Sequence, residues 1–346
     1  MNSTQSKIII APLNWGLGHA SRCVPIINAL ISEKFIPIIA SDGKALDFLK
    51  KEFPTLETLE LPSYHIKYGK NIKWNLLKQL PTILKAVKKE KQLLEQFIGK
   101  NKDVVGVISD NRFGVRSNRV PSVYITHQTT VLSGFTTFIT SKIHQNSIKK
   151  FNECWIPDTE DSLFSGKLSE FKKHKNQKFI GVLSRFKKEE LEKSINILVL
   201  LSGPEPNRTF FEKKLMLAFK KDTRNIVFVL GKVEVHQKKW TEKNLTFYNY
   251  VLSEELEKLI NASEIVVCRS GYSSIMDLAV LNKKVFFIPT KNQPEQEYLA
   301  SYFKEKKVAP FCILEDFTSY KLEEVQNYSG LNSEETKLSS DLFSLF

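Results

Sequence analysis

The chain contains the same local pattern twice: a continuous apolar run leads through a glycine turn into an amphipathic stretch. The first copy begins at residues 7–12 and the second at residues 194–201, and both runs have the length of a strand. Runs without polar alternation are typical of strands buried on both faces of a parallel sheet. Since further apolar runs alternate with amphipathic stretches after each copy, the sequence predicts two doubly wound α/β domains.

The individual elements follow from the same pattern. Strands are expected at residues 7–12, 35–40, 55–61, 104–109, 122–126, 194–201, 225–230, 245–248, 264–268 and 285–289. Helices are expected at residues 20–34, 206–220, 253–262, 273–281, 294–306 and 334–346. We expect domains at 1–175 and 176–330, joined within a charged linker at 158–193, and a C-terminal helix (331–346) packing back on the first domain. The expected ligand site is a cleft facing the carboxyl ends of both sheets.

Charge and composition narrow the function classes. The four cysteines are widely spaced, which indicates free thiols rather than structural zinc. No apolar run is long enough to cross a membrane and the N-terminus carries no signal pattern, so we expect a cytoplasmic protein. The net charge of +13 would suit nucleic acid, an anionic membrane or a phosphorylated substrate. Nucleic acid is disfavoured because no helix-turn-helix, RNP-like or zinc module is present.

Much of the positive charge lies in one segment. Residues 64–102 contain ten lysines and two glutamates. The part Lys67–Lys91 includes apolar residues at helical spacing, namely Trp74, Leu76, Leu77, Leu80, Ile83, Leu84 and Val87. One interpretation is a core-facing stripe with solvated lysines. The other is a peripheral contact with anionic lipid on the inner face of the cytoplasmic membrane, to which the apolar residues of 132–143 would add.

A glycine loop follows the first strand. Gly16 and Gly18 permit a tight turn and the close approach of a ligand to the N-terminus of the next helix. His19 stands in the first turn of that helix, where the helix dipole disfavours imidazolium, so it is a candidate base; alternatively its ring only caps a backbone group. Ser21 replaces the third glycine of the dinucleotide fingerprint, so NAD is not expected.

Polar residues also follow two later strands of the first half. Asp110 comes after the strand at 104–109, and His127 comes after the strand at 122–126. The carboxyl ends of parallel strands form one edge of a sheet, so both residues are expected at the ligand edge. Asp110 is a second candidate base or an acceptor ligand; the alternative is a residue that only forms a turn.

In the second half, two turns are candidates for phosphate binding. Ser202 and Gly203 follow the strand 194–201, but the prolines at 204 and 206 lack N–H groups, so this is a partial phosphate loop; the alternative is a plain turn between strand and helix. The turn Ser270–Gly271 follows the strand 264–268 and opens a helix whose N–H groups can hold phosphate oxygens. Ser273 and Ser274 would join them.

Side chains that could bind the ribose and the sugar of a nucleotide sugar come after this turn in the sequence. Asp277, just over one turn into the helix, can accept hydrogen bonds from ribose hydroxyls. Gln293, Gln296 and Glu297 follow the next strand and could bind the hydroxyls of a neutral sugar.

Residues 180–309, above all the block 266–271, resemble the nucleotide-sugar-binding half of the GT-B glycosyltransferase family that includes the peptidoglycan lipid-I N-acetylglucosaminyltransferase. The resemblance implies a GT-B fold, in which two Rossmann-like domains face each other across a cleft. The family's first-domain glycine loop matches Gly16, Gly18 and His19. Its remaining nucleotide-sugar contacts fall on Arg185, Val251, Arg269, Asp277, Gln296 and Glu297. Asp277 stands where the family has Glu, and Glu297 replaces the second of two glutamines.

These residues predict transfer of a hexose or N-acetylhexosamine from a UDP-sugar donor to a lipid-linked or envelope acceptor. No DxD triplet is present, so we expect a metal-independent, inverting displacement without a further cofactor. The segment 16–23 also resembles the start of a UDP-sugar hydrolase of nonulosonic-acid biosynthesis, in which water replaces the acceptor. A third hypothesis is a membrane-associated protein that binds UDP without turnover.

Overall fold

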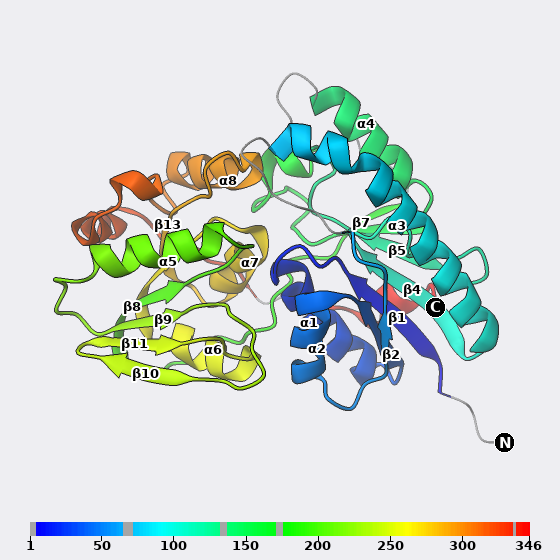
Figure 1. Cartoon of the computed structure of the whole chain (residues 1–346), viewed down its shortest axis with the longest axis horizontal. Coiled ribbons are helices and arrows are strands. Elements are labelled where there is room, and N and C mark those ends of the chain that lie inside the picture. Colours follow the sequence, from blue (N-terminus) through cyan, green and yellow to red (C-terminus); the bar gives the residue numbers. More distant parts are fainter. Residues whose placement is uncertain (1–4, 65–71, 132–136, 171–175, 335–336) are drawn as a thin grey trace. The chain divides into compact units, whose positions relative to one another are not determined.

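The computed structural model describes residues 5–64, 72–131, 137–170, 176–334 and 337–346. The chain forms two compact units (Figure 1): the first comprises Met1–Gly181 with Thr336–Phe346, and the second comprises Val182–Glu335. The division thus falls six residues after the boundary expected at 175/176. Each unit contains its own sheet covered by helices, as the repeated pattern predicts.

The first unit is a seven-stranded sheet in the order β3-β2-β1-β4-β5-β6-β7, and all neighbouring strands are parallel. Its strands are β1 (Lys7–Pro12), β2 (Ile36–Ser41), β3 (Thr58–Glu60), β4 (Val104–Asp110), β5 (Ser122–Ile125), β6 (Glu153–Ile156) and β7 (Gln177–Phe179). Its helices are α1 (Gly18–Ser32), α2 (Gly43–Glu52), α3 (Ile72–Lys100) and α4 (Thr137–Ile148). The strand order reverses between β1 and β4, which is the point where doubly wound sheets bind ligands.

The second unit is a six-stranded sheet in the order β10-β11-β9-β8-β12-β13. Its strands are β8 (Ile195–Leu200), β9 (Ile226–Val229), β10 (Lys239–Glu242), β11 (Leu245–Tyr248), β12 (Ser263–Cys268) and β13 (Lys284–Phe287). Its helices are α5 (Asn207–Ala218), α6 (Ser253–Asn261), α7 (Tyr272–Val280) and α8 (Pro294–Glu305). Only β10 is antiparallel to its neighbour, and the order reverses between β8 and β12.

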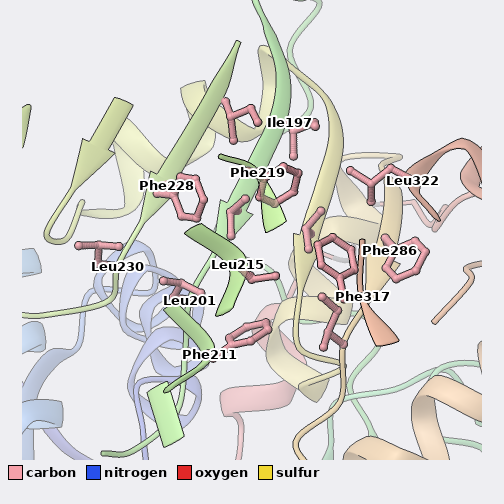
Figure 2. Close-up of a cluster of buried hydrophobic side chains, with 14 of the residues drawn as sticks. Ile197, Leu201, Phe211, Leu215, Phe219, Phe228, Leu230, Phe286, Phe317 and Leu322 are labelled. Carbon is pink, nitrogen blue, oxygen red and sulfur yellow. The ribbon is translucent and has the colours of Figure 1, made fainter. Parts of the chain in front are cut away.

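The core of the second unit shows why α5 forms on this sequence. Phe211, Leu215 and Phe219 recur at helical spacing, are almost wholly buried and belong to one cluster with residues of the central strands (Figure 2). The rings of Phe219 and Phe228 meet edge to face with centroids 6.0 Å apart. Burial of a phenylalanine or leucine side chain contributes about 1.5–3 kcal/mol, so this cluster fixes α5 against the sheet.

Several elements differ from the expected set, among them the helices α2 and α4, which the sequence pattern did not predict. The strands β6, β7 and β10 were not expected, and β10 is wholly exposed, so it lacks the apolar signal of a buried strand. The helix expected at 334–346 is instead a short 3-10 helix, η5 (Ser340–Phe343). Of its four side chains only Leu342 and Phe343 are buried, which is too little apolar surface to hold a longer helix. Phe343 and Phe346 pack their rings against Trp155 of β6 in the first unit.

Candidate active site

His19 and Asp110 lie together at the carboxyl edge of the first sheet. Asp110 is the last residue of β4, and Pro12 at the end of β1 is its register partner. The chain leaves β1, passes the glycine loop and enters α1, so that the His19 imidazole reaches the neighbouring strand end. His19 Nδ1 is 3.0 Å from Asp110 Oδ1. The structure therefore brings together two candidate catalytic residues that are 91 positions apart.

Arg22, one turn further along α1, completes this cluster. Its Nε donates to Asp110 Oδ2 over 2.7 Å, and its NH2 group contacts both Asp110 Oδ1 and His19 Nδ1, the latter at 2.8 Å. Asp110 is fully buried and Arg22 is 4% exposed. Burial would raise the pKa of Asp110, but the neighbouring Arg22 and His19 outweigh it and hold the pKa below its usual range. Asp110 is therefore an ionised hydrogen-bond acceptor.

The hydrogen bonds at His19 allow two arrangements of the imidazole proton. In one, Nδ1–H donates to Asp110 and the second ring nitrogen, Nε2, is left as a proton acceptor. In the other, Nδ1 accepts from Arg22 and the proton is on Nε2. Only the first arrangement makes His19 a base. An adjacent carboxylate is the group that commonly holds the proton on Nδ1.

Two further residues contact the cluster. His127, beyond the end of β5, has its Nδ1 3.0 Å from NH1 of Arg22. Since arginine can only donate, Nδ1 of His127 accepts and its proton lies on Nε2. Cys23 lies 3.8 Å from Asp110 Oδ2, and burial, together with that carboxylate, raises the pKa of its thiol. Cys23 is thus a packing residue rather than a nucleophile.

A second buried polar network holds the glycine loop. Asn14 donates to Asp42 Oδ2 over 3.0 Å, and Arg112 donates to Asp42 Oδ1 over 2.7 Å. Arg112, which is fully buried, also pairs with Glu90, and Glu90 accepts a bond of 2.7 Å from the Tyr64 hydroxyl. These groups come from segments following β1, β2, β3 and β4 and from α3. They fix the loop that leads from β1 to His19 at the start of α1.

Gly16 has the conformation that its motif predicts. Its φ of 79° lies in the left-handed region, and an added Cβ would meet no atom within 4 Å. The backbone geometry, rather than a neighbour, therefore requires glycine at this position. Gly18 begins α1 and its carbonyl accepts from the Ser21 hydroxyl over 3.1 Å.

In the second unit, the turn Ser270–Gly271 ends β12 and opens α7, as predicted. The Ser270 hydroxyl donates to the main-chain carbonyl of Gln296 over 2.7 Å, so it joins this turn to α8. Gly271 has φ −79°, and a Cβ at this position would meet nothing within 4 Å. Neither its backbone nor its packing requires glycine, and the space that a Cβ would occupy is free of other atoms. Ser273 and Ser274 are half-buried in the first turn of α7.

Arg269 and Gly203 are brought together by packing. The guanidinium of Arg269 donates to the Thr290 hydroxyl and to the carbonyl of Asn207, and it lies 4.8 Å above the ring of Phe211. A Cβ on Gly203, which has φ 99°, would lie 3.0 Å from the same guanidinium. Arg269 therefore ties together the loops that follow β8, β12 and β13. Ser202 beside it is exposed.

Asp277 and Arg185 form a buried pair. Asp277 accepts from the Ser184 hydroxyl over 2.8 Å, and its Oδ2 lies 3.8 Å from Nε of Arg185. Burial raises the pKa of Asp277, against the opposing effect of Arg185. Arg185 also donates to the Ser253 hydroxyl at the start of α6 over 3.1 Å, and Val251 is buried two residues earlier. The structure thus joins Asp277, Arg185 and Ser253 in one contact network, and binding of a nucleotide by these residues stays a prediction.

The side chains expected at the sugar hydroxyls take part in the start of α8. Gln293 is the N-cap and accepts from the amide of Gln296 over 2.6 Å. Gln296 Oε1 accepts from Thr290 N and Glu297 Oε1 from Asn292 N, each over 2.8 Å. The oxygens thus shape the loop, and the NH₂ group of Gln296 can still donate to a ligand. Sugar binding by these residues stays a prediction.

The described residues also bear on metal binding, membrane spanning and cavities. Within the described residues, no group of three or more His, Cys, Asp or Glu side chains is placed to hold a metal ion. None of the helices in the described parts of the chain is both long and apolar enough to span a bilayer. A 660 Å³ cavity in the first unit lies between β7 and the C-terminal segment and contains none of the predicted site residues.

Known proteins share both the domain and the fold. Residues 199–341 match the glycosyltransferase family 28 C-terminal domain. The glycosyltransferase of kitacinnamycin is 13% identical with a TM-score of 0.64, covering 93% of this chain and 89% of that one. MurG from Acinetobacter baumannii is 12% identical with a TM-score of 0.53, covering 94% and 92%. Phytolacca americana UGT2, in complex with UDP-2-fluoro-glucose and pterostilbene, is 13% identical with a TM-score of 0.62, covering all of both chains. No curated protein sequence matches.

The fold and the domain match identify the class of this protein: it is a glycosyltransferase of the GT-B type. More particularly, residues 199–341, most of which lie in the second unit, match the glycosyltransferase family 28 C-terminal domain, and the chain is similar to the MurG family. The expected α/β GT-B architecture is confirmed. That His19 and the Ser270–Gly271 turn face each other remains a prediction.

Proposed function

We propose that the protein transfers a hexose or N-acetylhexosamine from a UDP-sugar to an acceptor hydroxyl, with inversion at the anomeric carbon. The observation that carries the proposal is the contact between His19 and the buried, ionised Asp110 at the strand-order reversal of a GT-B fold. A carboxylate that accepts from Nδ1 leaves Nε2 to remove a proton. This is the arrangement that activation of a hydroxyl nucleophile requires.

The proposed reaction is one displacement. The acceptor oxygen bonds to the anomeric carbon as the bond from that carbon to UDP breaks, and the acceptor proton moves to Nε2 of His19. UDP leaves with the bonding electron pair. Main-chain N–H groups at the N-terminus of α7 face the charge that develops on the diphosphate, which can replace a metal ion in this role.

Support for a UDP donor comes from the second unit. The family 28 domain spans the Ser270–Gly271 turn, and one structural neighbour was solved with UDP-2-fluoro-glucose. The open space at Gly271 lets a diphosphate approach the backbone closely.

The acceptor is proposed to be lipid-linked or part of the cell envelope, met at the inner face of the cytoplasmic membrane. Residues 65–71 of the basic segment and the side chains of 72–80 lie outside the described residues, as do residues 132–136. In the described part of α3, Leu84 is 59% exposed beside the exposed Lys85, Lys88 and Lys89. Such a surface suits an anionic membrane.

The decisive experiment is turnover of a panel of UDP-sugars with and without lipid-linked acceptors. His19→Ala is expected to lower the rate of transfer by at least about 10²-fold, while UDP binding is retained. Gly271→Ala is expected to weaken UDP binding by about tenfold or more with little change in thermal stability. Gly99→Ala on α3 is the matched control, because an added methyl would meet only Arg119 at 3.8 Å. Undiminished turnover in His19→Ala would refute the proposal.

A UDP-sugar hydrolase is the second candidate. It is favoured by one observation: Arg22 and Cys23, which belong to the segment resembling such hydrolases, both contact Asp110. In that reaction His19 would activate water. Release of free sugar in the absence of any acceptor, at the rate seen with acceptors present, would select the hydrolase. Saturable UDP binding without turnover of any donor would instead select the inactive protein.

A further inference from the structure

The outer face of α5 combines exposed apolar and basic side chains. Phe210 is 51% exposed and Leu217 is 67% exposed, although Phe211 and Leu215 on the inner face are buried. Phe210 and Leu217 are seven residues apart, so they lie on one side of the helix. Single exposed apolar residues are ordinary on protein surfaces, but two large ones aligned on one helix face form a stripe.

Lysines surround this stripe. The exposed lysines of the segment are Lys213, Lys214, Lys220 and Lys221. Nζ of Lys214 lies 5.8 Å from the centroid of the Phe210 ring. The only acidic residue between 207 and 221 is Glu212, and it is paired with Arg208 and Lys232, each at 2.9 Å. The outer face therefore presents positive charge that no carboxylate of its own helix offsets.

The helix dipole explains the position of only two of these four lysines. Lys220 and Lys221 lie just beyond the C-terminal end of α5, where the helix dipole favours cations. That effect does not account for Lys213 and Lys214 in the middle of the helix, and it gives no reason for exposed apolar side chains between them.

We propose that the outer face of α5 is a lipid-facing surface that binds anionic phospholipid headgroups. An anionic bilayer satisfies both features, because the lysines reach the headgroup phosphates while Phe210 and Leu217 enter the acyl boundary. A nucleic acid would satisfy the lysines but not the apolar stripe. The surface belongs to the second unit and needs no sugar transfer to operate. Because α3 is proposed above to contact the same membrane, the test compares the partition coefficients of α5 variants with that of a protein in which α3 is unchanged.

Vesicle flotation of the full-length protein tests this inference, using phosphatidylcholine vesicles with and without about one quarter phosphatidylglycerol. Wild-type protein is expected to float only with the anionic vesicles. Replacing Lys213, Lys214, Lys220 and Lys221 by glutamine is expected to lower the partition coefficient by a factor on the order of 10³. The double variant Phe210→Ser, Leu217→Ser is expected to lower it by about tenfold or more.

The matched control removes the same charge from other exposed lysines of the second unit, Lys238, Lys239, Lys243 and Lys258. This control is expected to float like the wild type. Since all these side chains are exposed, circular dichroism and melting temperature should not change in any variant. The proposal is overturned if the α5 variants float as well as the wild type. It is also overturned if the control loses as much binding, or if the serine variant binds normally.

The outer face of α5 could alternatively be covered by a second copy of the chain. Sedimentation equilibrium decides between them: a dimer that dissociates in the Phe210→Ser, Leu217→Ser variant would show that the stripe is a subunit contact and would overturn the lipid proposal. A monomer in both proteins is the expected result.

Discussion

The Arg22–Asp110 pair allows fold stability and catalysis to be separated in one set of variants. Asp110 is fully buried and accepts two bonds from Arg22, whose side chain is also almost wholly buried. Removing either partner leaves the other buried without its opposite charge. Breaking such a pair typically costs about 3–5 kcal/mol, whereas removing both charges together costs much less.

The single variants Arg22→Gln and Asp110→Asn are therefore each expected to destabilise the protein by about 3–5 kcal/mol. For a unit of this size that corresponds to a fall in melting temperature of roughly 10 °C. The double variant places two neutral amides where the charged pair was, and we expect it to regain most of this loss.

Activity should follow a different rule. In Asp110→Asn and in the double variant no carboxylate accepts from Nδ1 of His19, so the proton is no longer fixed there and Nε2 is lost as a base. A comparable change in a serine-protease triad lowers kcat about 10⁴-fold. We expect a loss on the order of 10³-fold or more in the double variant, with the KM for the UDP-sugar little changed.

Thermal unfolding and steady-state kinetics on the four proteins complete this cycle. Recovery of stability without recovery of kcat would show that Asp110 orients His19. If the double variant regains both, Asp110 serves only the fold and the proposed mechanism is wrong. If the single variants unfold like the wild type, the assignment of a buried charged pair is wrong.

Three other substitutions test separate parts of the structure. Burial, together with the neighbouring Lys193, lowers the pKa of Lys283 from 10.5 to about 7. Between pH 7 and 10 the unfolded chain therefore binds more protons than the folded chain. The free energy of unfolding of the wild type, measured by urea titration, should rise over this range relative to that of Lys283→Met. Tyr64→Phe removes the donor to buried Glu90 and should cost about 1.5–3 kcal/mol by the same measurement. In Gly106→Ala the new methyl would clash with the Phe346 ring, so we expect a loss of about 1–2 kcal/mol in the free energy of unfolding, measured by calorimetry. Phe346→Ala in the same chain should remove most of this loss.

The sequence predicted most of the fold because buried parallel strands carry a strong signal. The runs at the start of each half are strands buried on both faces, as a continuous apolar run indicates. β10 was not predicted because all four of its residues are exposed, so it has no apolar run, and it is a strand only through its pairing with β11. The C-terminal helix was predicted too long, because two buried apolar residues stabilise the short helix η5 but not a longer one.

The sequence predicted several residues of the candidate site but not the hydrogen bonds between them. His19 and Asp110 were found because each follows a strand that ends at the ligand edge of a parallel sheet. Arg22 was visible only as part of a resemblance, since its partner Asp110 is 88 positions away and strand order decides which residues meet. Arg112 had no signal at all, because a fully buried arginine is recognised only by the carboxylates around it.

The pairing of Asp277 changes how experiments on the nucleotide half should be interpreted. One oxygen of this carboxylate accepts from the Ser184 hydroxyl and from the amide of Arg185, so Asp277 anchors the start of the second unit to α7. A carboxylate has about four acceptor positions, so the other oxygen can still accept from a ribose hydroxyl. Loss of UDP binding in Asp277→Ala would thus follow from either role. Ser184→Ala removes only the anchor, and comparison of UDP affinity in these two variants separates the contribution of the ribose contact from that of the fold.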